Sequence, residues 1–197
     1  MDAIGPDDAL IVVDVQNDFC AGGALAVPGA ERILDNVNRL LPRFRHVLAT
    51  KDWHPANHSS FKAQGGPWPP HCVQDTAGAD FHAALNTKLI QAVIHKGKDL
   101  DAPGYSGFEA TELAGELRRR GVKRVFTCGL ATDYCVRATT LAALEEGFQA
   151  LAVTDAMSAV EVNPGDGQRA LQDMQAAGAD LATTDQMLAP QPPATNI

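Results

Sequence analysis

Residues 123–154 read KRVFTCGLATDYCVRATTLAALEEGFQALAVT, and this stretch decides the fold. Its two ends, 123–128 and 150–154, are short apolar runs typical of strands that are buried on both faces. The segment 134–146 between them has the length and composition of a helix, which Gly147 ends. Strands that alternate with helices of this length predict a parallel sheet with helices on both faces.

The rest of the chain repeats this alternation. We therefore predict an α/β fold, a single-domain three-layer sandwich with a mainly parallel sheet of five to six strands covered by helices on both faces. The domain is expected over residues 1–190 and a flexible tail over 191–197. The further predicted strands are 9–13, 46–50, 92–95 and a weak edge strand at 180–183, and the further predicted helices are 31–41, 109–120 and 167–177.

Composition excludes several classes of protein. The chain has 197 residues, 45% of them hydrophobic and 20% charged, which indicates one globular domain rather than a disordered chain. A net charge of −8 without a basic stripe argues against nucleic acid as a partner. No apolar run reaches the ~18 residues of a membrane span. The N-terminus does not resemble a signal peptide, and the four cysteines form no C-x-x-C pair, so we expect a cytoplasmic location.

Polar residues follow four of the predicted strands, in the loops where parallel sheets bind their ligands. They are Asp14, Asp52, Lys96 and Cys135. Taken singly, each has an ordinary structural explanation, such as a loop brace, a solvated lysine or a small buried thiol. Together, Cys135, Lys96 and Asp14 form a candidate nucleophile, electrostatic partner and base.

Cys135 is the strongest of the four candidate thiols. It falls in the first turn of a predicted helix, where unpaired N–H groups and the positive helix end favour a thiolate and could hold an oxyanion. Cys128 lies inside an apolar strand and is expected to be inert. Cys20 and Cys72 lie in loops near the same edge and could line a pocket without reacting.

A long loop, residues 53–80, follows the second strand and is rich in histidine. Asp52 and His54 alternate along an extended segment, so both side chains face one side. A distant third histidine would complete a ligand set that leaves coordination positions of the metal open, which is typical of a catalytic metal rather than a structural one. The candidates are His58 and His71, and the alternative is a hydrogen-bonded loop without a metal.

Several motifs in order resemble one known family. The segments IVVDVQNDF, TKDWHPANHSSF, GGPWPPHCVQ, IHKG, YSGF and GLATDYCV are similar to those of nicotinamidases in the isochorismatase-like cysteine hydrolase superfamily, over about residues 9–183. The resemblance implies hydrolysis of nicotinamide to nicotinate and ammonia in NAD salvage, often with pyrazinamide as a second substrate. It also implies one divalent metal ion, with zinc as the expected metal and iron and manganese as alternatives.

The resemblance assigns roles to residues one by one. It implies a non-proline cis peptide between Leu130 and Ala131. It also implies three protein ligands plus waters, because His58 does not stand at the wider spacing of members that use an extra histidine, and His58 stays an open alternative as a ligand. Homo-oligomers are common in the superfamily, although no residue here identifies an interface. The assigned roles are Asp14, Lys96 and Cys135 for catalysis, Ala131 and Cys135 for the oxyanion hole, Phe19 and Trp68 for the substrate ring, and Asp52, His54 and His71 for the metal.

Other readings of the sequence fit less well. Isochorismatases lack the cysteine, and the superfamily's carbamoyl and ureido amidases lack the metal set. A silent metal- or ligand-binding domain would not need the complete triad. A dinucleotide-binding oxidoreductase is excluded because the turn after the first strand, VQNDFCAGG, lacks the G-x-G-x-x-G fingerprint.

Overall fold

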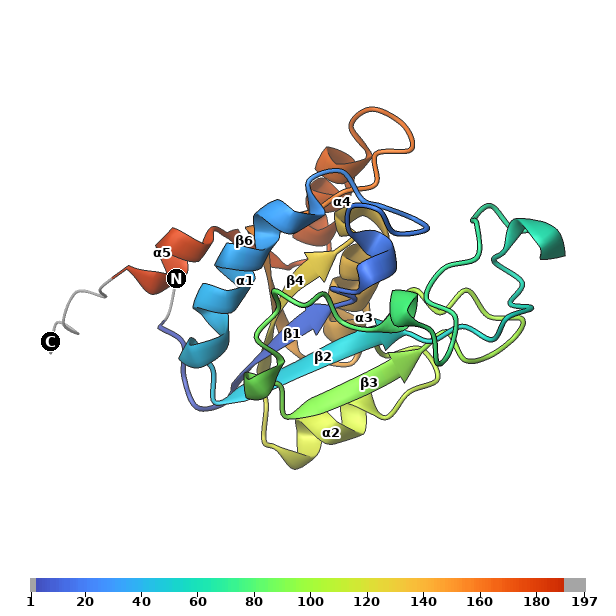
Figure 1. The fold of residues 1–197 in the computed structure, drawn as a ribbon. Helices are drawn as coiled ribbons and strands as arrows, with labels where there is room; N and C mark the ends of the chain where they lie inside the picture. Colours follow the sequence, from blue (N-terminus) through green and yellow to red (C-terminus); the bar gives the residue numbers. More distant parts are fainter. Residues whose placement is uncertain (1–2, 190–197) are drawn as a thin grey trace, which may run out of the picture.

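A six-stranded sheet forms the centre of the molecule in this computed structural model, which describes residues 3–189. The strand order is β3-β2-β1-β4-β5-β6, and neighbouring strands are parallel throughout. The predicted parallel sheet is therefore confirmed (Figure 1). The strands are β1 (Asp8–Val13), β2 (His46–Asp52), β3 (Ala92–Lys96), β4 (Arg124–Leu130), β5 (Gln149–Ser158) and β6 (Asp180–Ala182).

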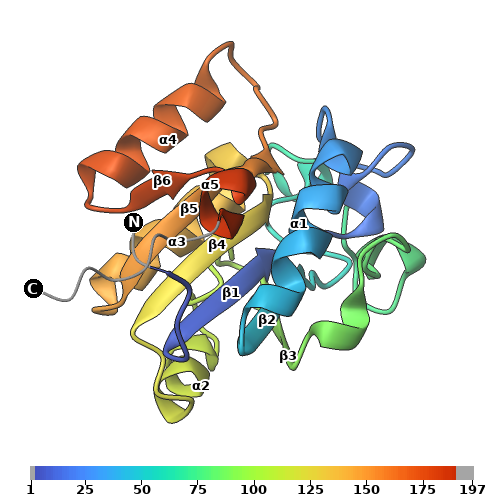
Figure 2. The same cartoon turned by 90° about the vertical axis from the view of Figure 1, so that its left-hand side faces the viewer.

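Helices cover both faces of the sheet, as predicted (Figures 1 and 2). Two of them, α1 (Leu34–Leu40) and α5 (Thr184–Leu188), pack into the hydrophobic cluster on one face. The other face carries α2 (Leu113–Arg119), α3 (Arg137–Glu145) and α4 (Asp166–Ala176). The described part of the chain is thus a three-layer sandwich.

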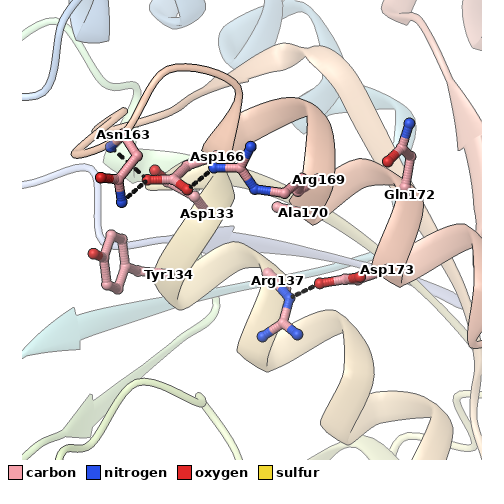
Figure 3. Close-up of a pocket in the computed structure, with 9 residues that line it drawn as sticks. All are labelled: Asp133, Tyr134, Arg137, Asn163, Asp166, Arg169, Ala170, Gln172 and Asp173. Carbon is pink, nitrogen blue, oxygen red and sulfur yellow. Dashed lines mark hydrogen bonds and ion pairs between the residues drawn. The ribbon is translucent and has the colours of Figure 1, made fainter.

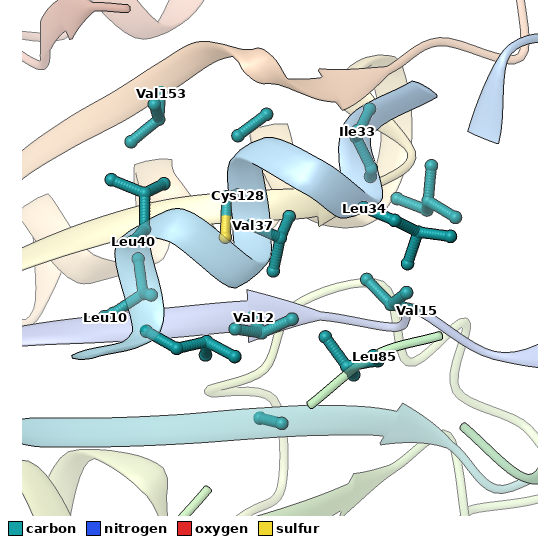
Figure 4. Close-up of a cluster of buried hydrophobic side chains, with 14 of the residues drawn as sticks. Leu10, Val12, Val15, Ile33, Leu34, Val37, Leu40, Leu85, Cys128 and Val153 are labelled. Carbon is teal, nitrogen blue, oxygen red and sulfur yellow. The ribbon is translucent and has the colours of Figure 1, made fainter. Parts of the chain in front are cut away.

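Alternating side chains of β1 build both layers of the core. Leu10 and Val12 point toward α1, whereas Ile11 and Val13 belong to the opposite cluster. All six residues of the strand are buried, which explains its continuous apolar run. Figure 4 shows the first cluster, in which α1 presents its buried residues at helical spacing to the sheet.

Two predicted helices differ from the structure at their ends, and so does α3, which begins at Arg137 rather than at residue 134. The helix predicted for 31–41 is split, because short 3₁₀ turns precede and follow α1, and Pro42 lies in the second of these. Pro42 fits there because the first residues of a helical turn need no N–H partner. The helix predicted for 109–120 begins only at Leu113, after Ala110 adopts a left-handed conformation with φ 52°.

One helix, α5, was not predicted. Thr183 and Gln186 begin it with a capping box, in which the Thr183 side chain accepts from the Gln186 N–H and the Gln186 side chain accepts from the Thr183 N–H. The spacing T-x-x-Q is a sequence signal for such a start. The tail predicted for residues 191–197 lies outside the described residues.

The carboxyl ends of the central strands share one edge of the sheet, and residues 53–80 project from that side (Figure 1). Gly129 allows a close approach there, since its φ is +111° and a Cβ atom would lie 2.1 Å from the Val13 carbonyl oxygen. The register between β4 and β5 shifts beside it, so β5 runs past the predicted end at 154. This packing brings the residues after β1 and β4 together.

Candidate active site

Lys96 ends β3 and lies at the centre of a buried polar cluster. Its side chain is fully buried, and its Nζ lies 2.8 Å from Asp14 Oδ2. The same ammonium donates to Asp52 Oδ1, to the Gly104 carbonyl at 3.0 Å and to Cys135 Sγ at 3.3 Å. Asp52 and Lys96 face each other because they are partners in the register of β2 and β3.

Asp14 follows β1 directly and offers one unused acceptor atom. Its φ of 49° is uncommon outside glycine, and such conformations concentrate at functional sites. Thr50 Oγ1 donates to Asp14 Oδ1 at 2.6 Å. Asp14 Oδ2 is the buried side-chain oxygen that accepts no hydrogen bond within the described residues, although Lys96 stands beside it. This oxygen is available to take a proton.

Cys135 lies in a wide helical turn between β4 and α3. Residues Thr132–Val136 form one π-helical turn, so the cysteine precedes α3 rather than standing in its first turn as predicted. The turn is fastened to the strand end because the Val136 N–H donates to the Ala131 carbonyl at 3.0 Å. The Leu130–Ala131 peptide is cis, as the resemblance implied. One donor atom each of Asp14, Asp52 and Cys135 lies within 4.8 Å of the others.

Burial governs the protonation of this cluster. It raises the pKa of the Cys135 thiol well above its usual range, and the nearby Lys96 charge lowers it only in part. Burial also raises the pKa of Asp14 against the effect of Lys96. The pKa of Lys96 is itself raised, because the Asp14 and Asp52 carboxylates outweigh desolvation. Burial thus opposes the thiolate predicted from the sequence at Cys135, and a base beside the thiol would offset this effect.

Asp52 joins this cluster to a group of histidines. Burial would raise its pKa, but the Lys96 charge outweighs burial and holds the pKa well below the usual range, so Asp52 is ionised. Its Oδ1 accepts from Lys96, and its Oδ2 lies 3.4 Å from His54 Nε2 and 3.9 Å from His71 Nε2. One carboxylate thus faces the lysine on one side and two imidazoles on the other.

The donor atoms of Asp52, His54 and His71 lie within 4.8 Å of one another, and all three residues are buried. His54 Nδ1 is 2.9 Å from the Gly97 carbonyl oxygen, and His71 Nδ1 is 2.8 Å from that of Pro69. A ring N–H held by a carbonyl in this way leaves Nε2 with its lone pair and fixes the ring. Two imidazoles and a carboxylate fit a divalent transition metal.

His58 is buried beside this group but uses both of its ring nitrogens elsewhere. Nδ1 lies 2.7 Å from Ser60 Oγ, and Nε2 lies 3.0 Å from the Ala102 carbonyl oxygen. Its ring stacks at a tilt on His54, with 4.2 Å between centroids. The contacts of His58 support the ring of His54 and leave no donor atom facing Asp52.

A small pocket opens above Cys135. The predicted ring-binding residues Phe19 and Trp68 both line it, as does Ala131. Sequence reasoning gave no role to Tyr105 and Tyr134, which complete an aromatic wall, although both lie in the motifs YSGF and TDYC. Trp68 Nε1 donates to Tyr105 Oη at 3.0 Å. The full lining is Phe19, Leu25, Asp52, Trp68, His71, Tyr105, Ala131, Tyr134, Cys135 and Val160.

The other thiols lie outside this arrangement. Cys128 is buried in β4, and burial raises its pKa. Cys72 is also buried, and its pKa is raised for the same reason. Burial and Glu31 raise the pKa of Cys20 to about 11. None of the three lines the pocket above Cys135.

No helix in the described range 3–189 has the length and apolar character that crossing a membrane requires.

Known proteins are similar to this chain over nearly its whole length. Residues 8–186 match the model of the isochorismatase domain. The chain is 42% identical to the nicotinamidase of Escherichia coli (strain K12), with 90% of this chain and 95% of the relative covered. It is also 42% identical to the nicotinamidase/pyrazinamidase of Mycobacterium tuberculosis, with 88% and 97% covered.

Solved structures show the same similarity. The crystal structure of PnC1 from L. infantum in complex with nicotinate matches with a TM-score of 0.89 at 41% identity, over 96% of this chain and 98% of that one. The pyrazinamidase of Pyrococcus horikoshii in complex with zinc matches with a TM-score of 0.84 at 47% identity, over 90% and 99%. The chain belongs to the isochorismatase family.

Proposed function

We propose that this chain is a nicotinamidase, a cysteine amidohydrolase that converts nicotinamide to nicotinate and ammonia in NAD salvage and also accepts pyrazinamide. The observation that carries the proposal is the contact of Lys96 with Asp14 and with Cys135, which lines an aromatic pocket. Asp52, His54 and His71 converge beside them. The relatives named above support the substrate. The cytoplasmic location predicted from the sequence stays part of this proposal.

Asp14 acts as the base that activates Cys135. As the Sγ atom attacks the amide carbon, the thiol proton passes to Asp14 Oδ2, the acceptor that is otherwise unused. Lys96 lies 2.8 Å from Asp14 Oδ2 and 3.3 Å from Sγ, so its charge stabilises the anion wherever it resides during the transfer. The same charge replaces the solvation that burial removes.

The tetrahedral oxygen is assigned to the backbone N–H groups of Ala131 and Cys135. The turn Thr132–Val136 holds these two residues close together at the end of β4. Two fixed N–H donors stabilise a developing oxyanion without reorganisation.

The Asp14 carboxyl group also transfers the protons in the two later steps, the departure of ammonia and the attack of water. Asp14 returns its proton to the amide nitrogen, the C–N bond breaks, and ammonia departs from a Cys135 thioester. Asp14 then takes a proton from water as its oxygen attacks the thioester carbon, and it returns that proton to Sγ as the C–S bond breaks. This step gives the free thiol and nicotinic acid, which ionises to nicotinate. The carboxyl group begins and ends each turnover ionised.

Asp52, His54 and His71 would hold one divalent metal ion, for which we propose zinc, with iron and manganese as alternatives. A metal held there would supply a Lewis acid for the pyridine nitrogen and would so orient the ring. Phe19 and Trp68 would lie against that ring, because both line the pocket between the ligand set and Cys135.

Product analysis tests this function. The metal-loaded protein should release nicotinate and ammonia in equal amounts from nicotinamide, and it should also hydrolyse pyrazinamide. Benzamide keeps the amide and the ring but lacks the ring nitrogen, so its kcat/KM should be lower by about 100-fold through lost alignment. Absence of nicotinate would contradict the function, whereas equal kcat/KM for benzamide would contradict only the anchoring of the ring.

A further inference from the structure

Residues 159–165 form an irregular strap between β5 and α4, and one of them reaches the pocket. Val160 is half-buried and lines the same pocket as Cys135 and Tyr134. The next residues, 161–164, are exposed. The strap therefore contributes one apolar side chain to the pocket lining, although it has no helix or strand of its own.

Asp133 holds this strap through two backbone hydrogen bonds. Its Oδ1 accepts from the Val160 N–H at 2.9 Å, and its Oδ2 accepts from the Glu161 N–H at 2.9 Å. Asp133 belongs to the π-helical turn that carries Cys135. Hydrogen bonds to an ionised carboxylate are stronger than neutral ones. One side chain thus connects the turn of the candidate nucleophile to the segment that carries Val160.

The far end of the strap is fastened to α4. Glu161 has φ 57°, and its carboxylate accepts from the N–H groups of Gly165 at 2.6 Å and Gly167 at 2.8 Å. Asp166 accepts from the Asn163 N–H at 2.7 Å. Asp133, Asn163 and Asp166 line one cleft beside α4, and Figure 3 shows Asp166 between Asn163 and Arg169. Asp133 is therefore the connection of the strap to the active-site turn.

We propose that Asp133 is a positioning residue, which holds Val160 against the bound substrate and so sets substrate affinity. The inference rests on the proposed function, because it concerns how the pocket binds nicotinamide. The N–H groups of Val160 and Glu161 lose both acceptors when the Asp133 carboxylate is removed, and the strap is then free to move from the pocket. Asp133 does not contact Asp14 or Lys96 in the described structure, so binding should change more than the chemical step.

A double-mutant cycle tests this connection. Val160→Ala should raise the KM for nicotinamide about tenfold, as loss of apolar contact in a binding pocket does. Asp133→Ala should raise the KM by a similar factor, with kcat changed less than about threefold. The double variant should resemble either single variant, because both changes remove the same contact.

Two further variants serve as controls. Asp133→Asn keeps one side-chain oxygen acceptor, so its KM should fall between those of the original chain and Asp133→Ala. Asp173→Asn alters an exposed ion pair in the same cleft, in which Arg137 Nε lies 2.9 Å from Asp173 Oδ2. This ion pair does not involve the strap. Its KM should stay within about twofold, since such pairs contribute little.

Hydrogen exchange measures the strap independently of activity. The amides of Val160 and Glu161 should exchange faster in Asp133→Ala, while those of α3 keep their protection. An additive double variant or an unchanged KM in Asp133→Ala would overturn the inference, and so would unchanged exchange at both amides. Absence of nicotinamide turnover in the original chain would instead overturn the proposed function, and the exchange data would still decide whether Asp133 holds the strap.

Discussion

The Thr50 hydroxyl hydrogen-bonds the buried Asp14 carboxylate. It donates to Oδ1 at 2.6 Å, whereas Oδ2 faces Lys96. Burial raises the pKa of Asp14, and the hydrogen bond from Thr50 opposes that rise. The proposed base, Asp14, therefore contacts a residue that sequence reasoning assigned only to a strand.

Thr50→Val should shift the acid limb of the activity profile. A hydrogen bond to the charged form lowers a pKa, so its loss raises the pKa of Asp14 further. Activity that needs the carboxylate is lost as the pH falls through this pKa, and the limb in kcat/KM should move up by about one pH unit.

Thr127→Val provides the matched control. Thr127 is a buried strand threonine whose hydroxyl lies 2.7 Å from that of Thr140, away from any carboxylate. The acid limb of kcat/KM should lie at the same pH in Thr127→Val as in the original chain. If the acid limb of kcat/KM lies at the same pH in Thr50→Val and in the original chain, Asp14 is not the base.

His71→Ala should lose the metal, since it removes one of three converging donors. His58→Ala changes another buried histidine of the same loop, whose two nitrogens face Ser60 and Ala102. It should keep about one metal ion per chain. Metal content measured on both purified variants decides the assignment, and equal loss in the two would place His58 among the ligands.

At the scale of elements, the strands were predictable because each is a short apolar run between loops. The residues at which the helices begin were harder to predict from the sequence. α2 begins late because Ala110 is left-handed, and α3 begins late because a π-helical turn comes first. The periodic spacing of hydrophobic residues does not reveal either feature. The capping box of α5 did have a signal, at Thr183 and Gln186.

Leu40→Ala tests the role of α1 as a core element. Leu40 is fully buried against the sheet (Figure 4), so the change should lower the free energy of unfolding by about 2–5 kcal/mol. Leu89, which is 38% exposed, is the control, and Leu89→Ala should cost less than about 0.5 kcal/mol. Denaturant unfolding measures both. Similar losses in the two variants would contradict the packing described here.

At the scale of the whole molecule, the parallel topology made most of the site predictable. Asp14, Asp52 and Lys96 each end or follow a strand, and adjacent parallel strands bring such residues to one edge. Contacts between loops were not predictable in this way. Val160 reaches the pocket through the hydrogen bonds of Asp133, and Tyr105 reaches it through Trp68, and neither contact follows from strand order.

The state of the thiol also required the three-dimensional structure. A helix start and a lysine favour a thiolate in sequence terms, yet burial outweighs both at Cys135. The degree of burial depends on how the loops close over the strand ends. The raised pKa of the thiol agrees with the proposed role of Asp14 as the base that takes its proton.

The measurement that tests the central claim most directly is nicotinate formation by cysteine variants. Cys135→Ala and Cys135→Ser should lose at least about 10⁴-fold in kcat with thermal unfolding little changed, because the attacking thiol is gone. Cys128→Ala removes another buried thiol, one outside the pocket, and should keep its turnover per folded molecule. Appreciable nicotinate formation by Cys135→Ala would contradict the account.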